Sequence, residues 1–123
     1  MNIKIRTTNF DLTPAIEEYV VRKIEPVSKF LHGGENALCE VELGKTTNHH
    51  KSGDIFRAEV NIVMPGKNQF FATAEEADLY VAIDIVRDQI EREIISKKTR
   101  RETLFRRGAT RIKFLLKQLT FRK

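Results

Sequence analysis

The residues best suited to do chemistry in this sequence are Lys and Arg, and half of them gather at one end of the chain. Residues 97–123 contain 11 basic side chains and a single acidic one, Glu102. The first 96 residues hold the other 11 basic side chains together with 16 acidic ones. Clustered cations bind phosphate groups, so this distribution indicates an anionic partner, either a nucleic acid or an anionic membrane surface.

Other reactive side chains give weaker signals. His49, His50 and Asp54 lie close together, but a zinc site takes three or four ligands and no further His or Cys stands at a suitable spacing. Cys39 occupies an apolar position of a predicted strand, which favours a small buried side chain. The sequence has no nucleophile elbow and no phosphate loop. We therefore expect no metal, no cofactor and no enzyme activity.

Length and composition fit one folded domain, since the chain has 123 residues of which 41% are hydrophobic. With Cys39 as the one cysteine, no intramolecular disulfide can form, which fits a reducing compartment. No stretch approaches the ~20 apolar residues of a membrane span, and the N-terminal MNIKIRTTNF lacks the apolar core of a secretion signal. We expect a cytoplasmic protein.

Alternation of apolar and polar residues predicts four strands, at residues 2–6, 37–45, 55–64 and 67–76. Pro65-Gly66 marks a tight turn between the last two strands. The pattern leaves open whether Phe70 or Phe71 points inward.

Apolar stripes at helical spacing predict two helices, over residues 14–31 and 78–98. The first begins with Thr13 as its N-cap and Pro14 in its first turn. Pro26 interrupts it, because proline removes a backbone hydrogen bond and crowds the preceding turn. We expect either a kink at Pro26 or a break after which Pro26 starts a second short helix.

Basic residues continue past the second predicted helix. After Ile95 its apolar stripe is continued by Lys97 and Arg101, which predicts that the helix extends beyond the sheet as a positively charged rod. Beyond Gly108 comes another apolar stripe, formed by Ile112, Leu115, Leu116 and Leu119. We therefore expect an α+β domain over residues 1–102 and a basic amphipathic helical extension over residues 103–123.

The element order β-α-β-β-β-α predicts a four-stranded sheet with both helices packed on one face. The outer surface of the two helices then becomes the natural place for a partner. With few aromatic residues beside the cations and no Trp, contact to backbone phosphates is favoured over stacking of bases. Such a surface suits a structured RNA that is recognised by its shape.

Several segments in order resemble one known family. TPAIEEYV (residues 13–20), HHKSGDIFRAEVNI (49–62), the PG turn and AEEADLYVAIDIVRDQIEREI (74–94) are similar to the bacterial ribosome hibernation-promoting factors, also called ribosome-associated translation inhibitors. The resemblance covers about residues 1–101. It implies a fold like that of double-stranded RNA-binding domains. It also implies binding to the small ribosomal subunit and its 16S rRNA, in the channel of messenger and transfer RNA.

Under this resemblance the protein blocks translation by steric competition and stabilises inactive ribosomes, including joined ribosomes, during stress or stationary phase, without a cofactor. The family's contacts to ribosomal RNA come from basic residues of the two helices. The matching positions here are Arg22, Lys23, Lys29, Arg87, Arg92, Lys97, Lys98, Arg100 and Arg101. A helical wheel places Arg22, Lys29, Arg87 and Lys98 outward, Lys23 beside the buried stripe and Arg92 on the far side. Tyr80 and Ile83 are expected in the core.

The C-terminal extension departs from the family pattern, since residues 103–123 are too few for the separate dimerisation domain of long members. The resemblance therefore implies a short type of factor with an added basic end. We expect additional ribosomal RNA contacts from Arg106, Arg107, Arg111, Lys113 and Lys117. The apolar stripe of the extension would then pack on the domain body, on a ribosomal protein or on a second copy of the chain.

Two other interpretations compete with this one. RIKFLLKQL (residues 111–119) has the layout of a basic amphipathic helix that binds a membrane surface or a partner protein. The body could also be a general RNA-binding domain.

Overall fold

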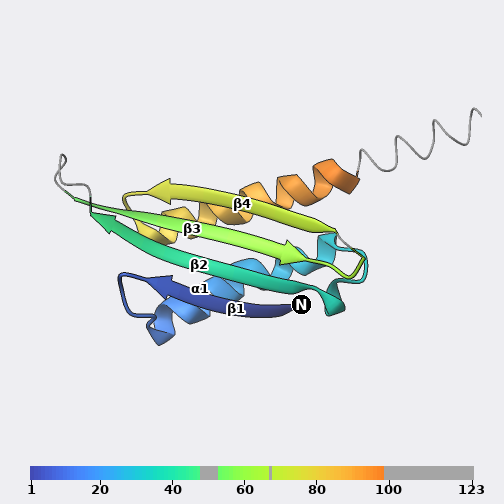
Figure 1. Ribbon diagram of the computed structural model, residues 1–123, viewed down its shortest axis with the longest axis horizontal. Helices are drawn as coiled ribbons and strands as arrows, with labels where there is room; N and C mark the ends of the chain where they lie inside the picture. Colours follow the sequence, from blue (N-terminus) through green and yellow to red (C-terminus); the bar gives the residue numbers. More distant parts are fainter. Residues whose placement is uncertain (48–52, 67, 99–123) are drawn as a thin grey trace, which may run out of the picture.

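The computed structural model describes residues 1–47, 53–66 and 68–98. Its elements follow the predicted order β-α-β-β-β-α, with two short 3-10 turns after the first helix (Figure 1). They are β1 (Asn2–Thr8), α1 (Pro14–Ile24), η1 (Glu25–Phe30), η2 (Gly34–Asn36), β2 (Leu38–Thr47), β3 (Asp54–Val63), β4 (Gln69–Glu76) and a second helix over residues 79–98. The extension over residues 103–123 lies outside the described residues, as do His49 and His50.

The four strands form one mixed sheet in the order β1-β2-β3-β4. β1 and β2 are parallel, and α1 provides the crossover between them, while the other two pairs are antiparallel. Both helices lie on the same face of this sheet (Figure 1). The predicted four-stranded sheet with two helices on one face is therefore confirmed.

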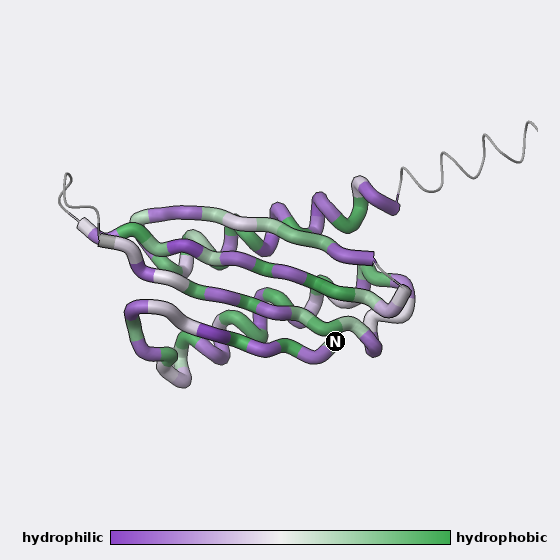
Figure 2. The backbone as a smooth tube through the Cα atoms, viewed as in Figure 1, coloured by the Kyte–Doolittle hydropathy of each residue, from purple (hydrophilic) through white to green (hydrophobic). Residues whose placement is uncertain are grey.

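Hydrophilic and hydrophobic residues alternate along the strands (Figure 2). Because alternate side chains of a strand point to opposite faces, the hydrophobic ones gather on the covered face and supply about half of the core. Val41, Val60 and Ile62 are buried beneath the helices. β3 and β4 pair Ile62 with Phe70, and residues directly opposite each other in an antiparallel pair share a face. Phe70 is accordingly 7% exposed, whereas Phe71 is 49% exposed on the uncovered face.

Residues at its two ends determine where the first helix begins and ends. The Thr13 side chain accepts a hydrogen bond from the Ile16 amide at 3.2 Å, and Pro14 occupies the first turn. α1 ends at Ile24, and Pro26 lies in the first turn of η1. Of the two predicted outcomes at Pro26, the break with a second short helix is correct.

The second helix begins after Asp78, whose carboxylate accepts from the amides of Tyr80 at 2.8 Å and Val81 at 3.3 Å. This is an N-cap arrangement. Its predicted apolar stripe is buried as expected, at Leu79, Ile83, Val86, Ile90 and Ile94. In the described ranges neither helix is long and apolar enough to cross a membrane.

The prediction that Lys97 lies on a helix end projecting beyond the sheet is wrong. The Lys97 Nζ donates to the backbone carbonyl of Gln69 at 2.6 Å and lies 5.2 Å from the centre of the Phe70 ring. The aliphatic stem of a lysine can cover apolar surface while its charged end reaches a polar partner. The helix is therefore still packed on β4 at this residue.

Gly34 is a packing constraint that can be tested directly. A Cβ atom at Gly34 would lie 2.7 Å from the Ser28 carbonyl oxygen, which already accepts from the Leu31 amide. We predict that Gly34→Ala lowers the free energy of unfolding by about 1–3 kcal/mol, measured by urea denaturation. Gly44→Ala is the matched control, since a Cβ atom there has nothing within 4 Å. Equal losses in the two variants would contradict the prediction.

Cys39 provides a second test, because it is fully buried and burial raises the pKa of its thiol to about 12, with Glu25 and Glu40 adding to the effect. The unfolded chain releases this proton near the ordinary value of 9.0. Stability is therefore predicted to fall as pH rises from about 9 towards 12, and to fall less in Cys39→Ala. Thiol reagents at pH 8 should label Cys39 only after unfolding. Rapid labelling of the native chain would refute its burial.

Candidate nucleic-acid interface

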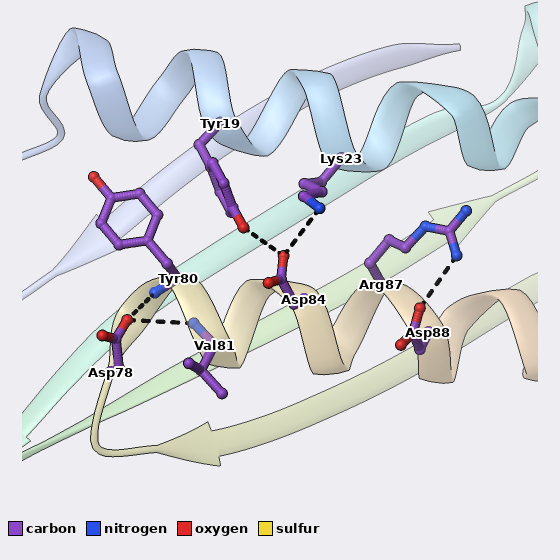
Figure 3. A network of polar contacts seen from close by, with 8 residues as sticks. All are labelled: Tyr19, Lys23, Asp78, Tyr80, Val81, Asp84, Arg87 and Asp88. Carbon is purple, nitrogen blue, oxygen red and sulfur yellow. Dashed lines mark hydrogen bonds and ion pairs between the residues drawn. The ribbon is translucent and has the colours of Figure 1, made fainter.

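The outer surface of the two helices contains a hollow between them. α1 and the second helix run side by side in the same direction (Figure 3). A hollow of about 420 Å³ lies between them on this surface, and its lining contains both cations and carboxylates. The lining residues are Arg22, Lys23, Pro26, Asp84, Arg87 and Asp88.

Asp84 is the centre of the contacts between the helices (Figure 3). The Tyr19 hydroxyl donates to its Oδ1 atom at 2.6 Å, and the Lys23 Nζ lies 3.6 Å from the same oxygen. The hydrogen bond to Asp84 raises the pKa of Tyr19 above its ordinary value, and partial burial acts in the same direction. One carboxylate from the second helix thus fixes two side chains of α1.

An aromatic pair lies beside this carboxylate. The Tyr19 and Tyr80 rings meet edge to face with centroids 4.8 Å apart. The Arg22 guanidinium carbon lies 5.2 Å and the Lys23 Nζ lies 5.6 Å from the centre of the Tyr19 ring. The candidate interface therefore combines cations with aromatic rings, although the sequence suggested few aromatic residues beside the cations.

The expected core position of Tyr80 is wrong, since 41% of this residue is exposed. The reason is geometric: Tyr80 follows the buried Leu79, and one residue along a helix turns the side chain by about 100°. Ile83 is buried as predicted. The pattern also missed Tyr19 and Asp84, whose partnership joins residues 65 positions apart.

The cations of the hollow are not equally available. Arg87 was expected to point outward, but its side chain is only 23% exposed and forms ion pairs with Asp88 and Glu91. Lys23 is half-buried beside the apolar stripe, as predicted, and is paired with Asp84. Arg22 is exposed. Within the described ranges it forms no ion pair.

Lys29, Lys97 and Lys98 lie at the far end of the helix pair. Lys29 is exposed and lies 5.1 Å from the Phe30 ring centre. Because α1 ends at Ile24 and η1 follows it, Arg22 and Lys29 belong to different elements and do not share one face of a continuous α-helix. Lys98 and Arg92 are exposed. The other basic positions lie outside the described residues: Arg100, Arg101, Arg106, Arg107, Arg111, Lys113 and Lys117.

The described ranges contain no group of three or more His, Cys, Asp or Glu side chains that could hold a metal ion.

Comparison with known proteins identifies the family of this chain. Residues 3–102 match the family model described as "Sigma 54 modulation protein / S30EA ribosomal protein". The chain belongs to this family.

Members of the S30EA family with curated names include the ribosome hibernation promotion factor of Lactococcus lactis subsp. cremoris, which is 32% identical over 101 residues. That match covers 81% of this chain and 51% of the relative. The Bacillus subtilis protein of the same name is 32% identical over 106 residues, with 86% of this chain and 53% of the relative covered. The chain thus spans about half the length of the curated relatives it matches.

Solved structures share the fold of this S30EA domain. The N-terminal domain of Thermus thermophilus Protein Y superposes with a TM-score of 0.63 and 29% identity, covering 76% of this chain and 96% of that one. A ribosomal subunit interface protein from Coxiella burnetii gives a TM-score of 0.63 at 19% identity, over 80% of this chain and 99% of that one. The latter likeness supports the fold alone.

The contact between Tyr19 and Asp84 predicts a titration that isolates a single phenol. The chain has two tyrosines, so Tyr80→Phe leaves Tyr19 as the one that remains. In this background we expect Tyr19 to ionise above the ordinary pKa of 10.0, because its proton is held by Asp84. Adding Asp84→Asn should move the pKa back towards the ordinary value, as followed by phenolate absorbance. An unchanged titration in Asp84→Asn would show that this hydrogen bond does not form in solution.

Proposed function

We propose that the chain binds the small ribosomal subunit through 16S rRNA, in the channel that messenger and transfer RNA use. The observation that carries this proposal is the set of exposed cations on the outer side of the two helices, in a chain of the S30EA family. Family relatives named ribosome hibernation promotion factors support it. A ribosomal partner would place the protein in the cytoplasm.

The basic residues of this surface fall into two groups, according to whether they already form an ion pair. Arg22, Lys29, Arg92 and Lys98 form no ion pair within the described ranges, so they meet phosphates without breaking an existing pair. Lys23, Arg87 and Lys97 already have acidic partners. Such partners hold a side chain in place and weaken its attraction for a further anion. We assign the main phosphate contacts to the first group.

The mechanism is occupation of the channel. A folded domain held by phosphate contacts excludes messenger and transfer RNA, which blocks translation and stabilises inactive ribosomes. This action needs no bond making and no cofactor. If ~6 phosphates are neutralised, the logarithm of the affinity falls with the logarithm of salt concentration with a slope of about −4 to −5.

The extension over residues 103–123 is assigned a supporting role. Its cations Arg106, Arg107, Arg111, Lys113 and Lys117 would add ribosomal RNA contacts, as would Arg100 and Arg101 before it. Its apolar stripe would pair with the domain body, a ribosomal protein or a second copy of the chain. A chain that ends at Glu102 should therefore bind more weakly and lose binding at lower salt.

Co-sedimentation with purified ribosomes and separated subunits tests the proposal. We predict that the full chain travels with the small subunit and with joined ribosomes. The triple variant Arg22→Gln, Lys29→Gln and Lys98→Gln should bind about tenfold or more weakly, with a salt slope smaller by about 2–3.

The control removes three cations from the uncovered face of the sheet, Lys4→Gln, Arg6→Gln and Arg57→Gln, and should bind like the natural chain. If the two triple variants weaken equally, net charge rather than the helix surface explains binding. Failure of the full chain to co-sediment even at low salt would overturn the proposal. Equal affinity for arbitrary duplex RNA would favour a general RNA-binding domain, and flotation with anionic liposomes would favour a membrane surface.

A further inference from the structure

Tyr80 is an exposed aromatic side chain that the core does not need. Its backbone amide donates to the Asp78 carboxylate at 2.8 Å, so its place in the first turn of the second helix is fixed. The edge-to-face contact with Tyr19 restrains its ring from one side. The rest of the residue is exposed, and its hydroxyl forms no hydrogen bond within the described ranges. A restrained and exposed ring is organised for contact with a flat partner.

The charges around Tyr80 suit a nucleotide. Arg22 lies against the same Tyr19 ring that Tyr80 contacts, so the cation and the exposed ring share one aromatic neighbour. Two carboxylates of this contact network already have partners: Asp84 has Tyr19 and Lys23, and Asp78 has helix amides. These contacts offset part of the negative charge that would repel a phosphate. A nucleotide offers the matching pair of a flat apolar base and an anion.

Phe71 shows that exposure alone does not make such a site. It is 49% exposed on the opposite face of the molecule, beside a hollow of about 560 Å³. Three carboxylates line that hollow, from Glu40, Glu42 and Glu59, against the two cations Lys4 and Arg6. Arg6 is already paired with Glu42. The hollow beside Phe71 therefore contains more carboxylates than cations, which disfavours a phosphate there.

We propose that Tyr80 is a stacking platform for an unpaired nucleobase, with Arg22 contacting a phosphate of the same strand. This inference rests on the proposed RNA-binding function and deepens it, because it names an unpaired base where the sequence favoured contact to backbone phosphates. Base-to-aromatic stacking is tolerant of base identity, since every base has a π face. The platform therefore contributes affinity for unpaired strands without reading their sequence.

The test compares two RNA octamers with equal numbers of phosphates, octaadenylate and its abasic analogue, each carrying a terminal dye. Fluorescence anisotropy gives the affinity of the full chain and of its Tyr80→Leu, Tyr80→Phe and Phe71→Leu variants. We expect the natural chain to prefer octaadenylate about tenfold. Tyr80→Phe and Phe71→Leu should keep that preference, while Tyr80→Leu should lose it and bind both octamers like the abasic one.

The chain carries its own optical reporter for this event, because it has no Trp and its two tyrosines are Tyr19 and Tyr80. Tyrosine emission of the natural chain should fall with octaadenylate and remain with the abasic octamer. Equal affinity of the natural chain for both octamers overturns the inference. A preference retained in Tyr80→Leu also overturns it, and retention in Tyr80→Phe shows that the fold of the site survives substitution.

Co-sedimentation separates this inference from the function on which it rests. If the natural chain travels with small subunits but shows no preference for bases, the stacking platform is wrong and the proposed function stands. If the preference depends on Tyr80 but the chain does not co-sediment, the platform is right and the ribosomal partner is wrong.

Discussion

One face of the sheet must be removed from water, and this requirement determines the arrangement of both helices. Val41, Val60 and Ile62 supply the apolar face of the sheet, and the two helices cover it with their own buried stripes, which include Ile24 and Ile90. Burial on this scale is the main favourable contribution to folding. Once each stripe faces the sheet, the opposite sides of the helices face outward next to each other. The proposed interface lies there, where side chains from two segments far apart in the chain are brought together.

Asp84 orders the side chains of the proposed interface. A carboxylate weakens the attraction of a surface for phosphate, yet this one accepts the Tyr19 hydroxyl and pairs with Lys23. Ionic hydrogen bonds of this kind hold side chains in defined positions. The hollow between the helices is therefore partly neutralised and well ordered, while available cations such as Arg22 lie at its border. The side chains around Asp84 thus gain defined positions, while the positive charge of the hollow is reduced.

The sequence predicted those features that depend on local periodicity and capping. The four strands, both buried stripes, the cap at Thr13 and an interruption of the first helix at Pro26 follow from patterns within a few residues, whereas the choice between a kink and a break needed the structure. The inward orientation of Phe70 could be assigned only from its register with β3, which no local sequence pattern contains. Tyr80 was misplaced because its neighbour Leu79 is buried, and the contact of Lys97 with Gln69 joins two elements. Of the site's contacts, the pair of Arg87 and Glu91 is local, one helical turn apart, whereas those made by Asp84 depend on the tertiary structure.

Because the two helices share one direction, charged side chains at their starts and ends are separated along the length of the described domain. Their starts lie at one end, with Glu17 in the first turn of α1 and Asp78 capping the second helix. At the other end are Lys29, Lys97 and Lys98. Acidic residues at helix starts and basic residues at helix ends match the backbone dipoles. For the described elements, the attraction of a polyanion is therefore strongest at the lysine end. Such a bias would arise from charges spread over the domain rather than from any single contact.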